Sequence, residues 1–322
     1  MNRAVTTPTT APIPAGAAWA RPAAPGPGVF RVRPLPGEAT ASYTTRLAAA
    51  YRLPLPHLLD GLGIHLNPGP GSTNGAAPTA ELHLNLPAAA RLAAHARTPQ
   101  PHLLRALPRL APGPHERPAP TSHTPAGPPA AHWQPLEPAH RPVRACTACV
   151  LHRSRGTSTA WIHPPDHTPA LCTRHQQAAD DPRHTAPLDI AALPELTRAH
   201  HQHRRAARHP AFTTALTWAA TITTRWYDHH QHLTDRWHTR LTRLTTTNPH
   251  TQHGPASPTL TCRTLITYPE TLTLAATLTR IPPHGLTPNA QARFLHHLAD
   301  QLEINHLTPA THDPLWTRIH TR

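Results

Sequence analysis

The hydrophobic positions of this 322-residue chain recur at helical spacing in several short segments. In the N-terminal third, a first helix is predicted from Ala39 and a second over residues 55–62, with Pro54 between them. Two short helices joined in this way form either a helix-turn-helix that reads DNA or an αα-hairpin that only packs, and the pattern leaves both open. The apolar positions that predict the two helices are Tyr43, Leu47, Ala50, Leu58, Leu59 and Leu62.

The same spacing predicts further helices along the chain. Residues 81–110 give two helical pieces that Pro101 interrupts, and the C-terminal half gives helices over residues 195–208, 212–226 and 233–244. After a loop at residues 245–258 and an apolar segment at 265–280, a last helix begins at Thr287-Pro288 and runs to Leu302. No segment outside residues 144–180 alternates convincingly with the period of a strand, so the predicted fold class is mainly α.

Proline-rich segments separate the helical ones. The chain has 43 prolines, and Leu, Ile, Val and Phe together make up about a sixth of its residues, below the ~20% at which disorder becomes an option. Residues 1–28 are predicted to form a disordered tail, residues 67–80 a flexible insertion and residues 111–143 an extended linker. We therefore expect small helical modules joined by unstructured segments.

The net charge of the chain indicates which class of molecule it binds. The formal net charge is +14, and all thirty basic residues are arginine. A GC-rich genome explains arginine in place of lysine, but it does not explain why bases exceed acids, so a polyanion such as nucleic acid is favoured. Arg204, Arg205 and Arg208, on the predicted helix 195–208, are the candidate DNA contacts; a merely solvated helix face is the alternative.

Neither a membrane span nor a secretory signal is predicted. No stretch approaches the ~20 consecutive apolar residues of a span, and the N-terminal residues lack a compact apolar core. A cytoplasmic location is expected, where cysteines stay reduced and close cysteine pairs indicate a metal rather than a disulfide.

Three of the four cysteines cluster in residues 144–180. They form the pattern Cys146-x-x-Cys149 and Cys172-x-x-His175, with Trp161 midway between the two pairs. Two close pairs of thiolate and imidazole ligands are typical of a structural zinc ion, held here in a small zinc ribbon. Spacing favours His175 as the fourth ligand, although His152, His163 and His167 are also near; Cys262 is expected to be a buried free thiol.

A catalytic role for this metal is not favoured. A catalytic zinc keeps an open position and a nearby carboxylate, whereas four ligands close the coordination shell and Asp166 is the only acid within residues 144–177. The deaminase pattern is also missing, because Ala145 precedes Cys146 and no His-x-Glu lies upstream. We therefore predict a non-enzyme with a structural Zn²⁺ and no small-molecule substrate, and rank a metal-dependent hydrolase last.

Two motifs together resemble the TniQ family. Its N-terminal motif, P-x-P-x-E-S-x-x-S-W-x-x-R-L-A, is similar to residues 34–48, with Ala39 in place of the usual Ser and Tyr43 in place of the usual Trp. Its second landmark, C-x-x-C, a Trp and C-x-x-H, is matched by residues 146–175. The matching positions of the first motif are Pro34, Pro36, Glu38, Ser42, Arg46 and Leu47.

The resemblance implies helix-turn-helix elements around a zinc domain and a role in selecting target sites for DNA transposition, in the cytoplasm at the nucleoid. Its expected partners are DNA, an AAA+ ATPase and a transposase. The alternative is an adaptor that docks on such an ATPase and contacts DNA little. Pro34, Pro36, Glu38 and Arg46 would then form an exposed partner-binding surface.

These inferences divide the chain into five parts. The predicted parts are a tail at residues 1–28, a helical region at 29–110, a linker at 111–143, a zinc ribbon at 144–180 and a helical domain at 185–322.

Overall fold

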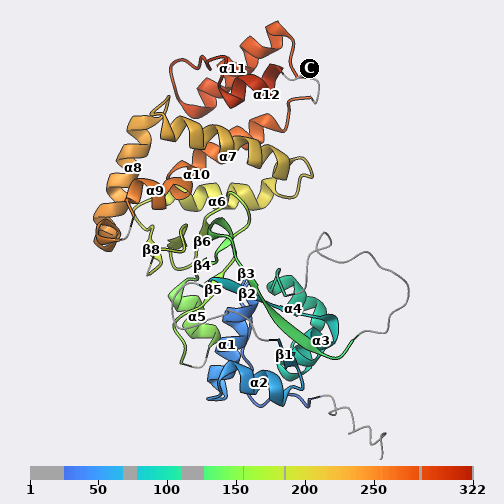
Figure 1. Cartoon of the computed structure of the whole chain (residues 1–322). Helices are drawn as coiled ribbons and strands as arrows, with labels where there is room; N and C mark the ends of the chain where they lie inside the picture. The colour runs from blue at the N-terminus through green and yellow to red at the C-terminus, as the bar shows by residue number, and fades with distance from the viewer. Residues whose placement is uncertain are drawn as a thin grey trace, which may run out of the picture.

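A computed structural model describes residues 25–67, 78–110, 127–154, 156–184, 186–254, 256–282 and 285–320. The described part is mostly helical, and its buried apolar residues gather into two large clusters and one small one. Figure 1 shows the N-terminal helices at one end, short strands in the middle and the C-terminal helices at the other end. The predicted tail up to residue 24 and the insertion at residues 68–77 lie outside the described residues.

Four helices and a small sheet form the N-terminal unit. The predicted first pair is found as α1 (Thr40–Ala50) and α2 (Leu55–Gly61), and the next pair as α3 (Leu86–His95) and α4 (Gln100–Ala106). Helices α2, α3 and α4 have proline in the first turn, where its missing N–H costs nothing. The Asn85 side chain also accepts a hydrogen bond from the Ala88 amide and caps α3.

The sheet of this unit corrects the expectation that residues 111–143 form a linker and that strands occur only near the cysteines. Strand β2 (Ala80–Leu84) pairs antiparallel with β3 (Ala130–Pro135), and β3 pairs parallel with β1 (His65–Leu66). All residues of β2 are buried, although apolar Ala80, Leu82 and Leu84 alternate with polar Glu81 and His83 in the sequence, a strand pattern that our helical interpretation of residues 81–110 missed. Residues 111–126 of the predicted linker lie outside the described residues.

Short strands and one helix carry the cysteines. After the 3-10 turn η1 (Pro138–His140), β4 (Val143–Arg144) pairs antiparallel with β5 (Trp161–Ile162), and α5 (Thr147–Arg153) lies between them in sequence. A second sheet contains β6 (Ala170–Cys172), β7 (Gln177–Ala179) and β8 (Leu188–Asp189). Ala178 and Leu188 belong to the C-terminal core, so this sheet joins the cysteine region to the C-terminal helices.

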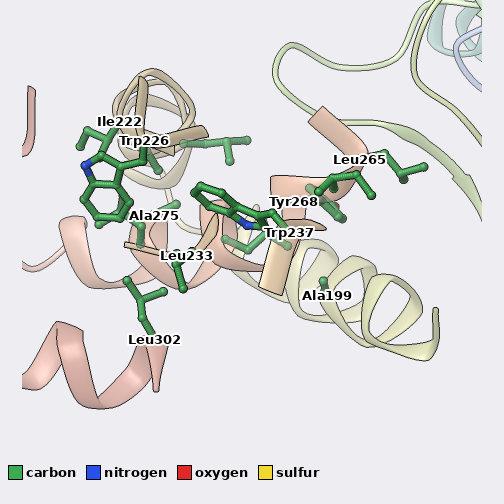
Figure 2. Packing of buried hydrophobic residues seen from close by; sticks show 14 of the residues in the cluster. Ala199, Ile222, Trp226, Leu233, Trp237, Leu265, Tyr268, Ala275 and Leu302 are labelled. Carbon is green, nitrogen blue, oxygen red and sulfur yellow. The ribbon is translucent and has the colours of Figure 1, made fainter. Parts of the chain in front are cut away.

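The C-terminal half is a helical bundle, as its apolar periodicity predicts. Helix α10 packs chiefly against α7 and α6, and Figure 2 shows Trp226, Trp237 and Tyr268 among the buried residues of the bundle. The elements of this half are α6 (Pro194–Ala206), α7 (Phe212–Asp228), α8 (Thr234–Thr247), η2 (Pro249–His253), α9 (Pro258–Thr261), α10 (Arg263–Leu278), α11 (Pro288–Leu302) and α12 (Pro314–His320).

Arg240 and Glu270 form a buried ion pair in the bundle. Both terminal nitrogens of Arg240 donate to the Glu270 carboxylate at 2.9 Å, and the Trp237 indole N–H donates to the same carboxylate at 3.1 Å. Such pairing is required of buried charges, because an unpaired one loses its hydration without compensation. None of the helices in the described residues has the length and apolar character needed to cross a membrane.

Candidate metal centre and its docking motif

Cys146, Cys149, Cys172 and His175 converge on one point. Their ligand atoms all lie within 4.8 Å of one another. The Nδ1 atom of His175 is 3.3 Å from the Sγ atoms of Cys146 and Cys149 and 3.4 Å from that of Cys172. Tetrahedral zinc with ordinary bond lengths needs about 3.6 Å between sulfur and nitrogen and about 3.8 Å between sulfurs. The spacing therefore fits one four-coordinate metal ion of zinc size.

The ligands come from two separate pieces of local structure. Cys146 directly precedes α5 and Cys149 lies in its first turn, so a helical turn brings the two thiols together. Cys172 ends β6, and His175 lies in the tight connection before β7, where Cys172 pairs with Gln177. The Gln177 side chain accepts a hydrogen bond from the Thr147 amide at 3.2 Å and links the two pieces. The connection between the two pairs thus contains a helix and strands of two sheets.

Two of the thiols, those of Cys146 and Cys149, lie in an environment that is unfavourable for negative charge. Burial first, and then the neighbouring Cys172, raises the pKa of Cys149 to about 12. Burial likewise raises the pKa of Cys146. Thiols that are crowded in this way lose their protons only when a nearby cation compensates the negative charge. A divalent metal ion provides that compensation.

The other candidate ligands lie elsewhere. His163 shares a hydrogen bond with the Glu81 carboxylate at 2.7 Å, while His152 and His167 are exposed. Cys262 is fully buried beside the Nε2 atom of His184, at 3.9 Å, and burial raises the pKa of its thiol to about 12. Of the described histidines, the one that meets the three thiols is therefore His175.

The N-terminal motif forms a buried ion pair. The Nε atom of Arg46 donates to Oε1 of Glu38 at 2.8 Å, and its NH2 group donates to Oε2 at 2.7 Å. Glu38 also accepts hydrogen bonds from the Ser42 hydroxyl and from the Leu35 amide. Because both partners are almost completely buried, this bidentate pair satisfies a carboxylate that is removed from water.

The motif docks directly on the cysteine region. The Ala39 amide donates to the Trp161 carbonyl, and the Trp161 amide donates to the Ser42 hydroxyl, both at 2.9 Å. The His163 amide donates to the Gly37 carbonyl at 2.7 Å, so residues 37–39 pair alongside β5. Arg46 also donates to Ser154, just beyond α5. The two sequence motifs are therefore two sides of one contact.

This burial corrects the expected partner-binding surface. Glu38 is 0% exposed and Arg46 is 3% exposed, and Pro34 is buried as well. Pro36 is the exposed member of the four. Glu38 and Arg46 hold the N-terminal unit against the cysteine region and are not available to a partner protein. Sequence patterns do not distinguish the two roles, because internal ion pairs and binding surfaces use the same residue types.

The candidate DNA-contacting arginines are exposed. Arg204 and Arg205 are in the last turn of α6, and Arg208 follows two residues after the end of the helix. No described carboxylate forms an ion pair with any of the three. Arg204 lines a cleft together with residues of the N-terminal unit, whereas Arg205 and Arg208 lie outside that cleft.

Comparison with known proteins gives one match. Residues 29–178 match the family model described as TniQ. No curated protein and no solved structure shows a significant match to the chain. The matched range begins just before the Glu38 motif and ends three residues after His175, so it contains both sides of the docking contact.

Proposed function

Because residues 29–178 belong to the TniQ family, we propose that this chain is a zinc-stabilised DNA-binding protein that acts as a target-site selector or adaptor in DNA transposition. The observation that carries the proposal is the contact between the two family motifs, with the four ligand atoms gathered beside it. Its partners in this role are DNA, an AAA+ ATPase and a transposase, and its place of action is the cytoplasm, at the nucleoid.

The zinc ion in this proposal is structural. The donor set of three thiols and one imidazole is that of a closed tetrahedral site, which contributes folding energy directly. A small cavity borders Cys146, Cys149 and Cys172, but no described carboxylate lines it as a general base would. The same observation disfavours the hydrolase alternative.

The DNA contact is proposed for the arginines near the end of α6. Arg205 and Arg208 are exposed, and unpaired guanidinium groups release counterions when they meet phosphates. Binding to duplex DNA should therefore weaken with salt, with a logarithmic slope of about −0.9 for each neutralised phosphate. Fluorescence anisotropy of a labelled duplex across a salt series measures this slope.

A charge-matched pair of variants tests the assignment. Replacing Arg205 and Arg208 by glutamine should reduce the magnitude of the slope by roughly 0.9 for each phosphate that is no longer neutralised. The control replaces the exposed Arg280, in the turn after α10, and the exposed Arg293, on α11, by glutamine, and should leave the slope unchanged. Equal effects of the two variants would contradict the assignment, and absence of duplex binding even at low salt would contradict DNA binding itself.

A further inference from the structure

A large cleft separates the N-terminal unit from the C-terminal bundle. It has a volume of about 850 Å³ and lies between α4 with its following turn, the loop at residues 162–171, and helices α6 and α7. This volume is within the ~300–1,000 Å³ range of sites that enclose ligands. The N-terminal unit, the cysteine region and the C-terminal bundle all contribute to its walls. A molecule bound there therefore contacts both ends of the protein at once.

The cleft is positively charged. Arg105 and Arg109 line it from the N-terminal unit and Arg204 lines it from α6, and no described carboxylate forms an ion pair with any of them. Among its described lining residues, the single acid is Asp166. Burial lowers the pKa of His200 to about 4, so this cleft histidine is neutral at pH 7 and the arginines carry the charge.

The rest of the lining combines apolar surface with the side chains of four histidines and three threonines. The half-buried Leu171 contributes aliphatic surface, and α7 adds the exposed side chains of Thr213 and Thr217. The wall is also rich in proline, whose ring offers no N–H donor. The prolines that line the cleft are Pro36, Pro108, Pro164, Pro165 and Pro169.

This combination favours a peptide over a nucleic acid. Duplex DNA meets proteins along exposed, wet and strongly polar surfaces, and single strands require stacking aromatic side chains. Among phenylalanine, tyrosine and tryptophan side chains, Phe212 is the described one that lines the cleft, and it is 2% exposed and packs in the core. A concave apolar site with a few convergent guanidinium groups instead suits an extended segment whose apolar side chains are flanked by carboxylates.

We propose that the cleft between α4, the 162–171 loop and helices α6–α7 is the docking site for an extended acidic peptide segment of a partner protein. Arg105 and Arg204 bind its carboxylates, and the proline-rich wall beside Leu171 binds its apolar side chains. Exposed Pro36, at the edge of the N-terminal motif, lines the same cleft. The inference does not depend on the DNA contact at Arg205 and Arg208, which lie outside the cleft.

The probe for the test is a short fluorescein-labelled peptide in which aspartate and glutamate flank two leucines, and binding to the full chain is followed by anisotropy. Changing Arg105→Glu together with Arg204→Glu should weaken binding by at least about tenfold, because two attractive charges become repulsive. The control is Arg205→Glu with Arg208→Glu, which has the same net charge and should bind the peptide like the unmodified chain. Loss of binding in both variants would show a nonspecific charge effect and overturn the proposal.

An uncharged variant tests the position of the site independently. Thr217→Trp places a large side chain on a wall of the cleft, whereas Thr221→Trp places it one turn further along the exposed face of α7, outside the cleft. The first should block the acidic peptide and the second should not.

Three further outcomes would overturn the proposal. The first is equal binding of the peptide by both tryptophan variants. The second is the absence of saturable binding of the acidic peptide to the unmodified chain. The third is a competition experiment in which a DNA duplex displaces the peptide and the Arg105/Arg204 variant loses DNA binding. The last outcome would assign the cleft to nucleic acid. Failure of the Arg205/Arg208 test alone would leave the cleft assignment standing, so the two proposals fail separately.

Discussion

Glu38 and Arg46, eight residues apart, form a bidentate ion pair at 2.7 and 2.8 Å inside the contact between the N-terminal unit and the cysteine region. The hydrogen bonds around the pair connect three segments. Glu38 accepts a hydrogen bond from the Leu35 amide, Ser42 accepts one from the Trp161 amide, and Arg46 donates to Ser154 beyond α5. The motif thus holds together the region, residues 29–178, that matches the TniQ family model.

Removing one partner of this pair should be strongly destabilising. Arg46→Ala leaves the Glu38 carboxylate buried without its counter-charge, and we expect a decrease of about 3–5 kcal/mol in unfolding free energy. Chemical denaturation monitored by tryptophan fluorescence measures the decrease. The control, Arg263→Ala, breaks the more exposed pair with Asp228 and should cost less than about 1 kcal/mol. A similar small cost for Arg46→Ala would contradict the bracing role.

Gly37 should not tolerate a side chain. Its φ is +75°, a left-handed conformation, and an added Cβ would lie 2.9 Å from the His163 carbonyl oxygen. Gly37→Ala should destabilise the chain by more than the roughly 1–2 kcal/mol cost of left-handed geometry alone. Gly61→Ala is the matched control, because nothing lies within 4 Å of its added Cβ at the end of α2. The melting temperature should fall clearly further for Gly37→Ala than for Gly61→Ala. Equal melting temperatures of the two variants would show that the contact with the His163 carbonyl is relieved without a loss of stability.

Metal removal should unfold the cysteine region. Cys172→Ser should lower the bound zinc, measured by mass spectrometry of the purified chain, and should lower the melting temperature, as a chelator does to the unmodified chain. Cys262→Ser is the control, since this thiol is buried away from the cluster and should leave zinc content unchanged. A chain that contains no zinc and melts identically with and without chelator would contradict a structural metal.

Asp180 should make stability depend on pH. Burial, chiefly, raises the pKa of this carboxyl to about 7, although its Oδ2 accepts a hydrogen bond from the Leu265 amide at 2.8 Å. The folded state therefore holds a proton that the unfolded state has already released above pH ~4. The stabilisation is complete below that pH and disappears as pH rises to about 7.

Asp180→Asn isolates this effect. The asparagine amide keeps an acceptor for the Leu265 amide but does not titrate. Between pH 5 and pH 7, the unfolding free energy of the unmodified chain should therefore fall, relative to that of the variant, by up to about 1.4 kcal/mol per pH unit. Urea unfolding of both chains at several pH values measures the difference. A constant difference across this range would contradict the raised pKa.

Much of the helical structure was predictable because helices carry their own local signals. Thr287 followed by Pro288 marks the start of α11, and the apolar periodicity from Phe212 to Trp226 predicts α7. Strand β2 carries a local signal that we missed, since Leu82 and Leu84 alternate with Glu81 and His83. Its pairing was not predictable, because its partner β3 is about fifty residues away in a proline-rich segment.

The candidate metal ligands were also predicted from the sequence alone. Close pairs such as Cys146 and Cys149 converge through a single turn, so their spacing alone predicts one ion, and the scarcity of cysteine makes the pattern specific. Choosing His175 over the other nearby histidines also rested on local spacing.

Only the tertiary structure decided which charged residues are buried. Glu38 and Arg46 look like a surface motif until the cysteine region covers them, and Arg204 and Arg205 look equivalent until the N-terminal unit forms a cleft beside one of them. Local spacing determines what adjacent residues can do together, whereas burial depends on segments far apart in the sequence. The sequence by itself therefore determined the helices and the ligand set, and only the folded chain decided which motif braces the protein and which arginines remain free to bind.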